Sequence, residues 1–213
     1  MRTTDEHWLI ARDANLLRAD SGRYRECRLL CLPDQSRSAR VPRTKSASIV
    51  RGQGRAVSSH ADPDTTFELV QCDEAGDPIR PFGVMPPALG DLCSGSAALY
   101  ANIGFEPPWV SYIAVSKGEP VGGGAFVGKP KDGFVEIAYF TMEQFQGRGF
   151  ASRTAGLLVR IARETAPRVT VTAKTLREIN ASTKILERLG FRHVRDVMDD
   201  DAGLVWEWHL PPA

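Results

Sequence analysis

The chain has 213 residues, with 27 lysines and arginines against 26 aspartates and glutamates, and 42% of the residues are hydrophobic. Such a composition predicts a soluble globular protein with one domain of ordinary size plus an appendage. It excludes a membrane span, because no stretch approaches the roughly 20 apolar residues required, and the first residues lack the apolar core of a secretory signal. The cysteines at 27, 31, 72 and 93 have neither CxxC nor zinc spacing, so we expect reduced thiols, no metal and a cytoplasmic location.

Positive charge is concentrated at the start of the chain. Residues 1–60 hold 12 of the 27 basic residues and 6 of the 26 acidic ones. The segment 34–65 is rich in Ser, Arg and Gly and has too few large apolar residues to offset the entropy lost on ordering. We therefore expect residues 1–65 to form a disordered or weakly structured extension and residues 66–213 to form the folded domain. The extension lacks interleaved aromatic residues and any folded DNA-binding pattern, so a nucleic-acid partner is not expected.

The elements expected after residue 66 are a strand, one or two short helices, three strands, a helix, a strand, a helix and two strands. Their segments read, in order, TFELVQC, PPALGDLCSGSAALYANIG, WVSYIAV, VGGGAFVG, FVEIAYFT, ASRTAGLLVRIARETA, RVTVTAKTL, INASTKILERLGF, HVRDV and LVWEWHL. The three consecutive strands predict an antiparallel meander. In the last helix, Asn180 or Ser182 is expected to cap the start, and Gly190 the end. The predicted fold class is α/β, in the α+β sense, with a mixed, mostly antiparallel sheet flanked by helices.

The junction EQFQGRGFAS, residues 143–152, places two glycines and an arginine between a predicted strand and a predicted helix. Unpaired N–H groups at a helix start attract anions, and glycines let a phosphate approach them. The GxxxxGK[ST] loop of nucleotide-binding enzymes is absent, and Ser152 stands where the dinucleotide fingerprint needs its third glycine. The pyrophosphate loop of acyl-coenzyme A transferases is the remaining interpretation.

The run Gln146-Gly147-Arg148-Gly149-Phe150-Ala151 matches the Q/R-x-x-G-x-G/A signature of the GNAT superfamily of N-acetyltransferases. The segments FVEIAYFT and NASTKILERLGF resemble that superfamily's fourth strand and last helix. In detail the chain looks most like the branch containing the ribosomal-protein-alanine acetyltransferases. The resemblance covers about residues 66 to 210.

The resemblance implies a splayed sheet that holds acetyl-coenzyme A between the strands at 134–141 and 169–176. The pantetheine is then expected along the backbone of Phe140 and Thr141, and the pyrophosphate on the amides of residues 147–152. Asn180 and Ser182 match last-helix positions that face the coenzyme, although helix capping explains these residue types equally well. The residues expected to bind the coenzyme are Phe140, Thr141, Gln146, Gly147, Arg148, Gly149, Phe150, Ala151, Ser152 and Asn180.

Acetyl transfer from a thioester to an amine needs a base for the ammonium proton and an N–H donor for the thioester oxygen. Glu136 is a carboxylate among strand-forming residues, which favours a role as general base or amine ligand over a solvent-facing position. An amide of residue 140 or 141 is the expected donor. Many members of the superfamily carry a tyrosine, the acid for the leaving thiolate, where this chain has Leu186. Ser182 or water could replace it.

The sequence thus predicts an acetyl-coenzyme A-dependent N-acetyltransferase that acts on a primary amine. The alternative is a non-catalytic coenzyme A-binding module, which Leu186 at the acid position supports and Glu136 opposes. The acceptor stays open between a protein N-terminus and a small-molecule amine, and the chain is expected to be a monomer or a homodimer without membrane partners.

Overall fold

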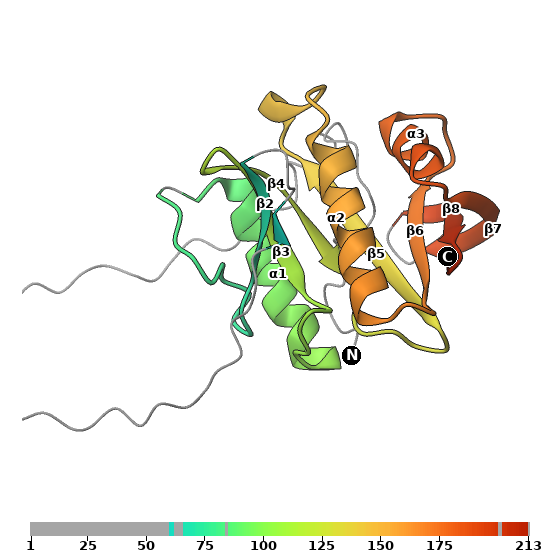
Figure 1. Cartoon of the computed structure of the whole chain (residues 1–213), viewed down its shortest axis with the longest axis horizontal. Helices are drawn as coiled ribbons and strands as arrows, with labels where there is room; N and C mark the ends of the chain where they lie inside the picture. Colours follow the sequence, from blue (N-terminus) through green and yellow to red (C-terminus); the bar gives the residue numbers. More distant parts are fainter. Residues whose placement is uncertain (1–59, 62–65, 84, 200–201, 213) are drawn as a thin grey trace, which may run out of the picture.

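The structure is a computed structural model that describes residues 60–61, 66–83, 85–199 and 202–212. The predicted extension at 1–65 lies outside the described residues, apart from a two-residue strand at 60–61. The described elements are β1 (His60–Ala61), β2 (Phe67–Gln71), α1 (Pro87–Ile103), β3 (Ser111–Ser116), β4 (Glu119–Phe126), β5 (Phe134–Thr141), the 3₁₀ turn η2 (Glu143–Phe145), α2 (Phe150–Thr165), β6 (Thr170–Leu176), α3 (Ala181–Arg188), β7 (Arg192–Asp199) and β8 (Gly203–Leu210). Figure 1 shows their arrangement.

The strands in the described part of the chain form one eight-stranded sheet in the order β1-β2-β3-β4-β5-β6-β8-β7. Strands β3, β4 and β5 form the predicted antiparallel meander, and β7 and β8 form the predicted terminal hairpin. The pair β5–β6 is parallel, whereas the other described pairs are antiparallel. The predicted fold class, a mixed and mostly antiparallel sheet flanked by helices, is confirmed.

The sheet opens between β5 and β6. The two strands pair over three residues each, Phe134–Glu136 opposite Thr170–Thr172. Beyond Glu136, β5 continues to Thr141 with only β4 as its neighbour. Figure 1 shows the consequence: β6, β7, β8 and α3 stand apart on one side, and the remaining strands with α1 and α2 stand on the other. The splayed sheet therefore leaves the second half of β5 with one unpaired edge.

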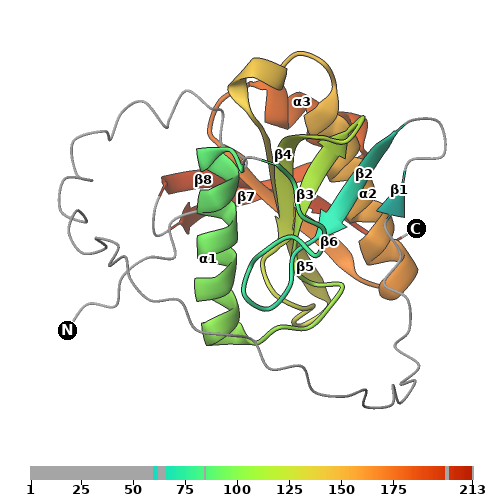
Figure 2. The same cartoon turned by 90° about the vertical axis from the view of Figure 1, so that its left-hand side faces the viewer.

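Helices α1 and α2 cover opposite faces of the first five strands, as the two views in Figures 1 and 2 show together. One buried cluster joins α2 residues such as Leu158 to α3 and to β5 and β6, and a second joins Leu89 and Leu92 of α1 to β2 and β3. The glycines of β4 permit this packing. A Cβ at Gly123 would lie 2.5 Å from a methyl of Leu92, and one at Gly124 would lie 2.8 Å from a methyl of Thr154.

Two local predictions can be refined. The segment after residue 86, predicted as one or two short helices, is a single helix of 17 residues, α1, which ends at Gly104. The cap of α3 is Asn180: its side-chain oxygen accepts from the Thr183 amide, while the Thr183 hydroxyl accepts from the Asn180 amide. Gly190 follows the helix with φ of 90°, as predicted.

Cys72 and Cys93 are free, buried thiols, and the other two cysteines lie outside the described residues. Among the helices of the described residues, none is both long and apolar enough to cross a bilayer.

Candidate active site

The loop between β5 and α2 forms an open cradle of backbone. Gly147 and Gly149 have φ values of 74° and 80°, which favour glycine, and Gly149 immediately precedes the first residue of α2. A Cβ built at either glycine would meet no atom within 4 Å. No side chain caps this helix start, so the N–H groups of its first turn keep their capacity to bind an anion. The glycines thus shape a tight turn and leave open space beside its backbone.

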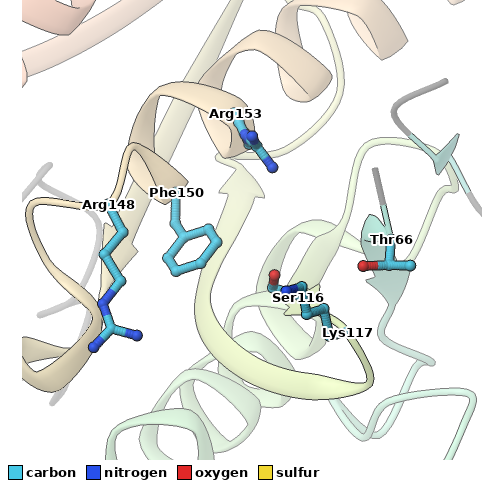
Figure 3. Close-up of a pocket in the computed structure, with 6 residues that line it drawn as sticks. All are labelled: Thr66, Ser116, Lys117, Arg148, Phe150 and Arg153. Carbon is cyan, nitrogen blue, oxygen red and sulfur yellow. The ribbon is translucent and has the colours of Figure 1, made fainter. Parts of the chain in front are cut away.

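A pocket of about 470 Å³ opens beside this helix start and is lined by Thr66, Ser116, Lys117, Arg148, Phe150 and Arg153. Figure 3 shows the three residues from the start of α2 on one side and Thr66 with the turn after β3 on the other. Three of the lining side chains are cationic and none is a carboxylate. The positive charge of these side chains, together with the N-terminus of α2 beside them, fits a phosphate-bearing ligand.

The backbone groups of β5 point alternately toward β4 and toward the gap beside β6. Val127 donates to the Glu136 carbonyl at one end of the strand and Met142 donates to Val121 at the other, and the register between them is regular. Residues 136, 138, 140 and 142 therefore direct their backbone groups toward β4. The amides of Ile137, Tyr139 and Thr141 face the gap between β5 and β6. Of the two amides predicted as donors to the thioester oxygen, the register favours Thr141 and directs that of Phe140 to β4.

Two hydroxyls beside this edge lack partners. Among the described residues, the buried side-chain atoms without a hydrogen-bond partner are Tyr139 Oη and Thr141 Oγ1. Tyr139 is 4% exposed and Thr141 9%. Buried polar atoms in proteins are nearly always paired, so these two hydroxyls, on alternate residues of β5, are exceptions. Glycine cradle, cationic pocket and unpaired hydroxyls together fit the phosphates and pantetheine of a coenzyme A thioester.

Glu136 lies on β5 at the point where β6 departs. Its Oε2 is 3.4 Å from Nζ of Lys174 on β6, and that Nζ is also 3.3 Å from Oδ2 of Asp199 at the end of β7. Burial raises the pKa of the Glu136 carboxyl above its usual range, and the Lys174 ammonium partly offsets this effect. The same two carboxylates raise the pKa of Lys174 against the opposing effect of its burial. The predicted base, Glu136, is therefore half-buried beside the Lys174 ammonium, at the point where β5 and β6 separate.

The other predicted residues fall at the start and inside of α3. Asn180 and Ser182 are half-buried at its first turn, and Asn180 is engaged in the capping hydrogen bonds. Leu186 is fully buried in the cluster that also contains Tyr139 and Leu158. The position of the superfamily's tyrosine is thus occupied by a packed aliphatic side chain.

Sequence reasoning missed Lys174, Asp199, Lys117, Arg153 and the unpaired Tyr139 hydroxyl. The signal used for Glu136, a charged residue within a run of strand-formers, also singles out Lys174 in TVTAKTL. Lys117 and Arg153 come from distant segments, and only the folded chain brings them to one pocket. The residue type of Tyr139 does not reveal that its hydroxyl lacks a partner. Within the described residues, no three His, Cys, Asp or Glu side chains gather as a metal site.

Comparisons with known proteins agree with this geometry. Residues 59–192 match the family model described as an acetyltransferase (GNAT) domain, whereas no curated protein matches the chain. Among solved structures, a ribosomal L7/L12 alpha-N-protein acetyltransferase, RimL, has a similar fold in its apo form, with 20% identity, a TM-score of 0.51, and coverage of 70% of this chain and 94% of that one. RimL in complex with coenzyme A gives 16% identity, a TM-score of 0.54, and coverage of 73% and 98%.

A third similar structure is an acetyltransferase from Salmonella typhimurium that modifies the N-terminal serine of ribosomal protein L7/L12, with 16% identity, a TM-score of 0.51, and coverage of 70% and 97%. At these identities the likeness establishes the fold alone. The family match covers more than half of the chain and contains the glycine loop, β5 and α3. The chain belongs to the GNAT acetyltransferase family.

Proposed function

We propose that this protein transfers the acetyl group of acetyl-coenzyme A to a primary amine, with Glu136 as the general base. The observation that carries the proposal is the position of Glu136, half-buried where β5 and β6 separate, on the strand whose free edge faces the gap. A module that only bound coenzyme A would need no general base at this place.

The residues proposed to bind the coenzyme lie in the glycine loop before α2 and on the free edge of β5. The backbone of Gly147, Gly149 and the first turn of α2 receives the pyrophosphate, and Arg148 adds positive charge beside it. The predicted contacts of Gln146, Phe150, Ala151 and Ser152 belong to the same loop and turn. The amide of Thr141 is the donor for the thioester oxygen. Asn180 and Ser182 remain proposed contacts at the start of α3.

The acceptor amine arrives protonated at neutral pH, because the reference pKa of a lysine is about 10 and that of an N-terminal amine about 8. A carboxylate at the reaction centre attracts the ammonium and removes its proton, directly or through one water molecule. A raised pKa suits Glu136 to this task, because a base whose pKa lies nearer the working pH is the stronger base. The neutral amine then attacks the thioester carbon.

The acceptor class is proposed as a protein N-terminus or a small-molecule amine. Solved structures of similar fold carry the names of N-terminal acetyltransferases of ribosomal protein L7/L12, which makes peptide N-termini the first substrates to examine. The cytoplasm is the proposed location, since ribosomal proteins and free acetyl-coenzyme A meet there.

The test measures thiol release from acetyl-coenzyme A with and without a panel of amines, together with the mass of each product. The panel holds peptides with free N-termini, the same peptides blocked at the N-terminus, polyamines, aminoglycosides and amino acids. We expect thiol release that depends on one amine class and a matching acetylated product. Tight coenzyme binding with no amine-dependent release across the panel would instead support the non-catalytic module, which the absence of an acid at Leu186 favours.

A further inference from the structure

Departure of the coenzyme's thiolate is the step whose proton donor the sequence leaves open between Ser182 and water. Leu186 is aliphatic and fully buried. Glu136 accepts a proton in the proposed reaction and so is not free to donate one at the same moment. A thiolate that leaves within a buried cleft is poorly solvated, and a nearby donor lowers the barrier to its departure.

Tyr139 carries an O–H group with no assigned use. Its hydroxyl lacks a hydrogen-bond partner although the residue is only 4% exposed. Leaving such a group unpaired destabilises a folded protein, so a structural role does not account for it. The other buried tyrosines among the described residues differ in this respect: the Tyr112 hydroxyl donates to the Pro108 carbonyl at 2.8 Å, and the Tyr100 hydroxyl accepts from the Ser111 amide at 2.7 Å.

The placement of Tyr139 on β5 also suits a donor. It is three residues from Glu136, so the two side chains point to opposite faces of the strand. Tyr139 belongs to the buried cluster of α2 and α3, together with Leu158 and Leu186. Glu136 faces Lys174 and Asp199 on the other side. The backbone of Tyr139 lies on the free edge of β5, where the register places the thioester donor Thr141 two residues further on.

We propose that Tyr139 is the catalytic acid that protonates the departing thiolate of coenzyme A, an inference that rests on the proposed amine acetylation. The amine nitrogen forms a bond to the acetyl carbon as the carbon–sulfur bond breaks. The proton of the amine passes to Glu136, and the phenol proton of Tyr139 passes to the sulfur. After the thiol leaves, Glu136 returns its proton to solvent and the phenolate regains one from it, so the products are the amide and the free thiol.

The surroundings of Tyr139 keep its phenol protonated. Burial raises the pKa of the Tyr139 phenol well above its ordinary value, so the group is protonated throughout the neutral range. On the opposite face, Lys174, Asp199 and Glu207 shift the pKa of Glu136, whereas the pKa of Tyr139 is raised by burial.

The test compares Tyr139→Phe with the matched control Tyr112→Phe in the full chain. Removal of an unpaired hydroxyl should leave the Tm of Tyr139→Phe unchanged or higher, whereas Tyr112→Phe loses a hydrogen bond and should melt lower with normal turnover. Turnover of Tyr139→Phe with a confirmed amine should fall by about 10² or more, with coenzyme A affinity by calorimetry within about threefold of the unaltered protein.

A second readout needs no turnover. The thiol of bound coenzyme A is titrated by thiolate absorbance, and loss of the phenol donor should raise its pKa by about one unit or more. Equal thiol pKa values and equal turnover in Tyr139→Phe and the unaltered protein overturn the assignment. If Tyr139→Phe fails to fold, Tyr139→3,5-difluorotyrosine replaces it. We then expect the alkaline limb of turnover against pH to move to lower pH. An alkaline limb that does not move overturns the assignment equally.

The two proposals fail in different ways. If the unaltered protein acetylates no amine, the proposed function fails and the role of Tyr139 falls with it. If the unaltered protein is active and Tyr139→Phe keeps its turnover, only the role of Tyr139 is wrong.

Discussion

The ammonium of Lys174 lies 3.4 Å from the carboxylate of Glu136, across the point where the sheet opens. Both side chains are partly exposed, at 27% and 21%, and Lys174 is held from its other side by Asp199. The pair therefore fixes the position and the charge of the proposed base. Further along the same face, Glu207 contacts Arg195 at 2.7 Å and His209 at 2.8 Å.

The first prediction concerns Lys174→Met, which removes this cation. Burial and the carboxylates of Asp199 and Glu207 then act on Glu136 unopposed, so its pKa rises further above the ordinary value when the effect of Lys174 is lost. Since Glu136 works in its ionised form, activity appears only above its pKa. We expect the acid limb of kcat/KM to move to higher pH in Lys174→Met, with Lys174→Arg close to the unaltered protein.

Arg177→Met is the matched control for this change. Arg177 follows β6 and pairs with Asp196 at 2.9 Å, so its loss removes a cation near the same strand end without touching Glu136. The acid limb should stay in place. An identical acid limb in Lys174→Met and the unaltered protein would contradict the role given to the Lys174–Glu136 pair.

The second prediction concerns Gly149→Glu in the glycine loop. A carboxylate at this position stands where the pyrophosphate is proposed to bind, and we expect coenzyme A affinity by calorimetry to fall by at least about tenfold, or 1.4 kcal/mol. Gly149→Ala is the control, since it carries the same cost of a side chain at φ of 80° without the charge. Unchanged affinity in a folded Gly149→Glu variant would remove the phosphate site from this loop.

The third prediction uses two glycines in opposite surroundings. A Cβ at Gly122 would lie 2.3 Å from the backbone oxygen of Phe140, so Gly122→Ala must displace β5 and should lower the free energy of unfolding by at least about 1 kcal/mol. Gly90 lies in α1 with no atom within 4 Å of a Cβ, and Gly90→Ala should raise it by about 0.5–1 kcal/mol. Chemical denaturation measures the free energy of unfolding of both variants. If it changed in the same direction in both, the described β4–β5 packing would be wrong.

The fourth prediction concerns the proposed N-terminal extension. The family match starts at residue 59, and β1 pairs with β2 from residue 60, so the informative truncation removes residues 1–58. We expect a soluble domain with nearly unchanged Tm, because that segment offers few apolar residues to a core. Removal of residues 1–71, which takes away the buried Phe67 and Leu69, should abolish cooperative melting. Aggregation of the shorter truncation would show that residues 1–58 contribute to the fold.

Most of the fold could be predicted from the sequence, because its elements carry strong local patterns. Leu157, Leu158 and Ile161 repeat at helical spacing and are all buried in α2. The order of the sheet, with β8 between β6 and β7, could not be derived from local patterns, because the partner of a strand depends on packing between distant segments. The glycines of β4 predict only a weak strand, and the folded chain explains them: Gly123 and Gly124 lie against helices α1 and α2, and Gly122 lies against the backbone of β5.

The candidate site divides in the same way. Glu136 and the loop at 146–151 could be proposed from the sequence, through residue types, spacing and the resemblance to the GNAT superfamily. Lys174, Lys117 and the unpaired hydroxyl of Tyr139 could not, since their significance lies in what surrounds them after folding. The sequence shows that a charged or hydroxyl-bearing residue is present, but not whether an ion-pair or hydrogen-bond partner lies beside it.

The most direct test of the central claim, that Glu136 is the base for amine acetylation, is the pH profile of turnover in Glu136→Gln at saturating amine. The exposed Glu119, at the start of β4, provides the control variant Glu119→Gln, which should match the unaltered protein. We predict that turnover of Glu136→Gln falls by about 10² or more near neutral pH and recovers partly at higher pH, as unprotonated amine accumulates. Turnover equal to that of the unaltered protein across the whole pH range, in a folded Glu136→Gln variant, would contradict the claim.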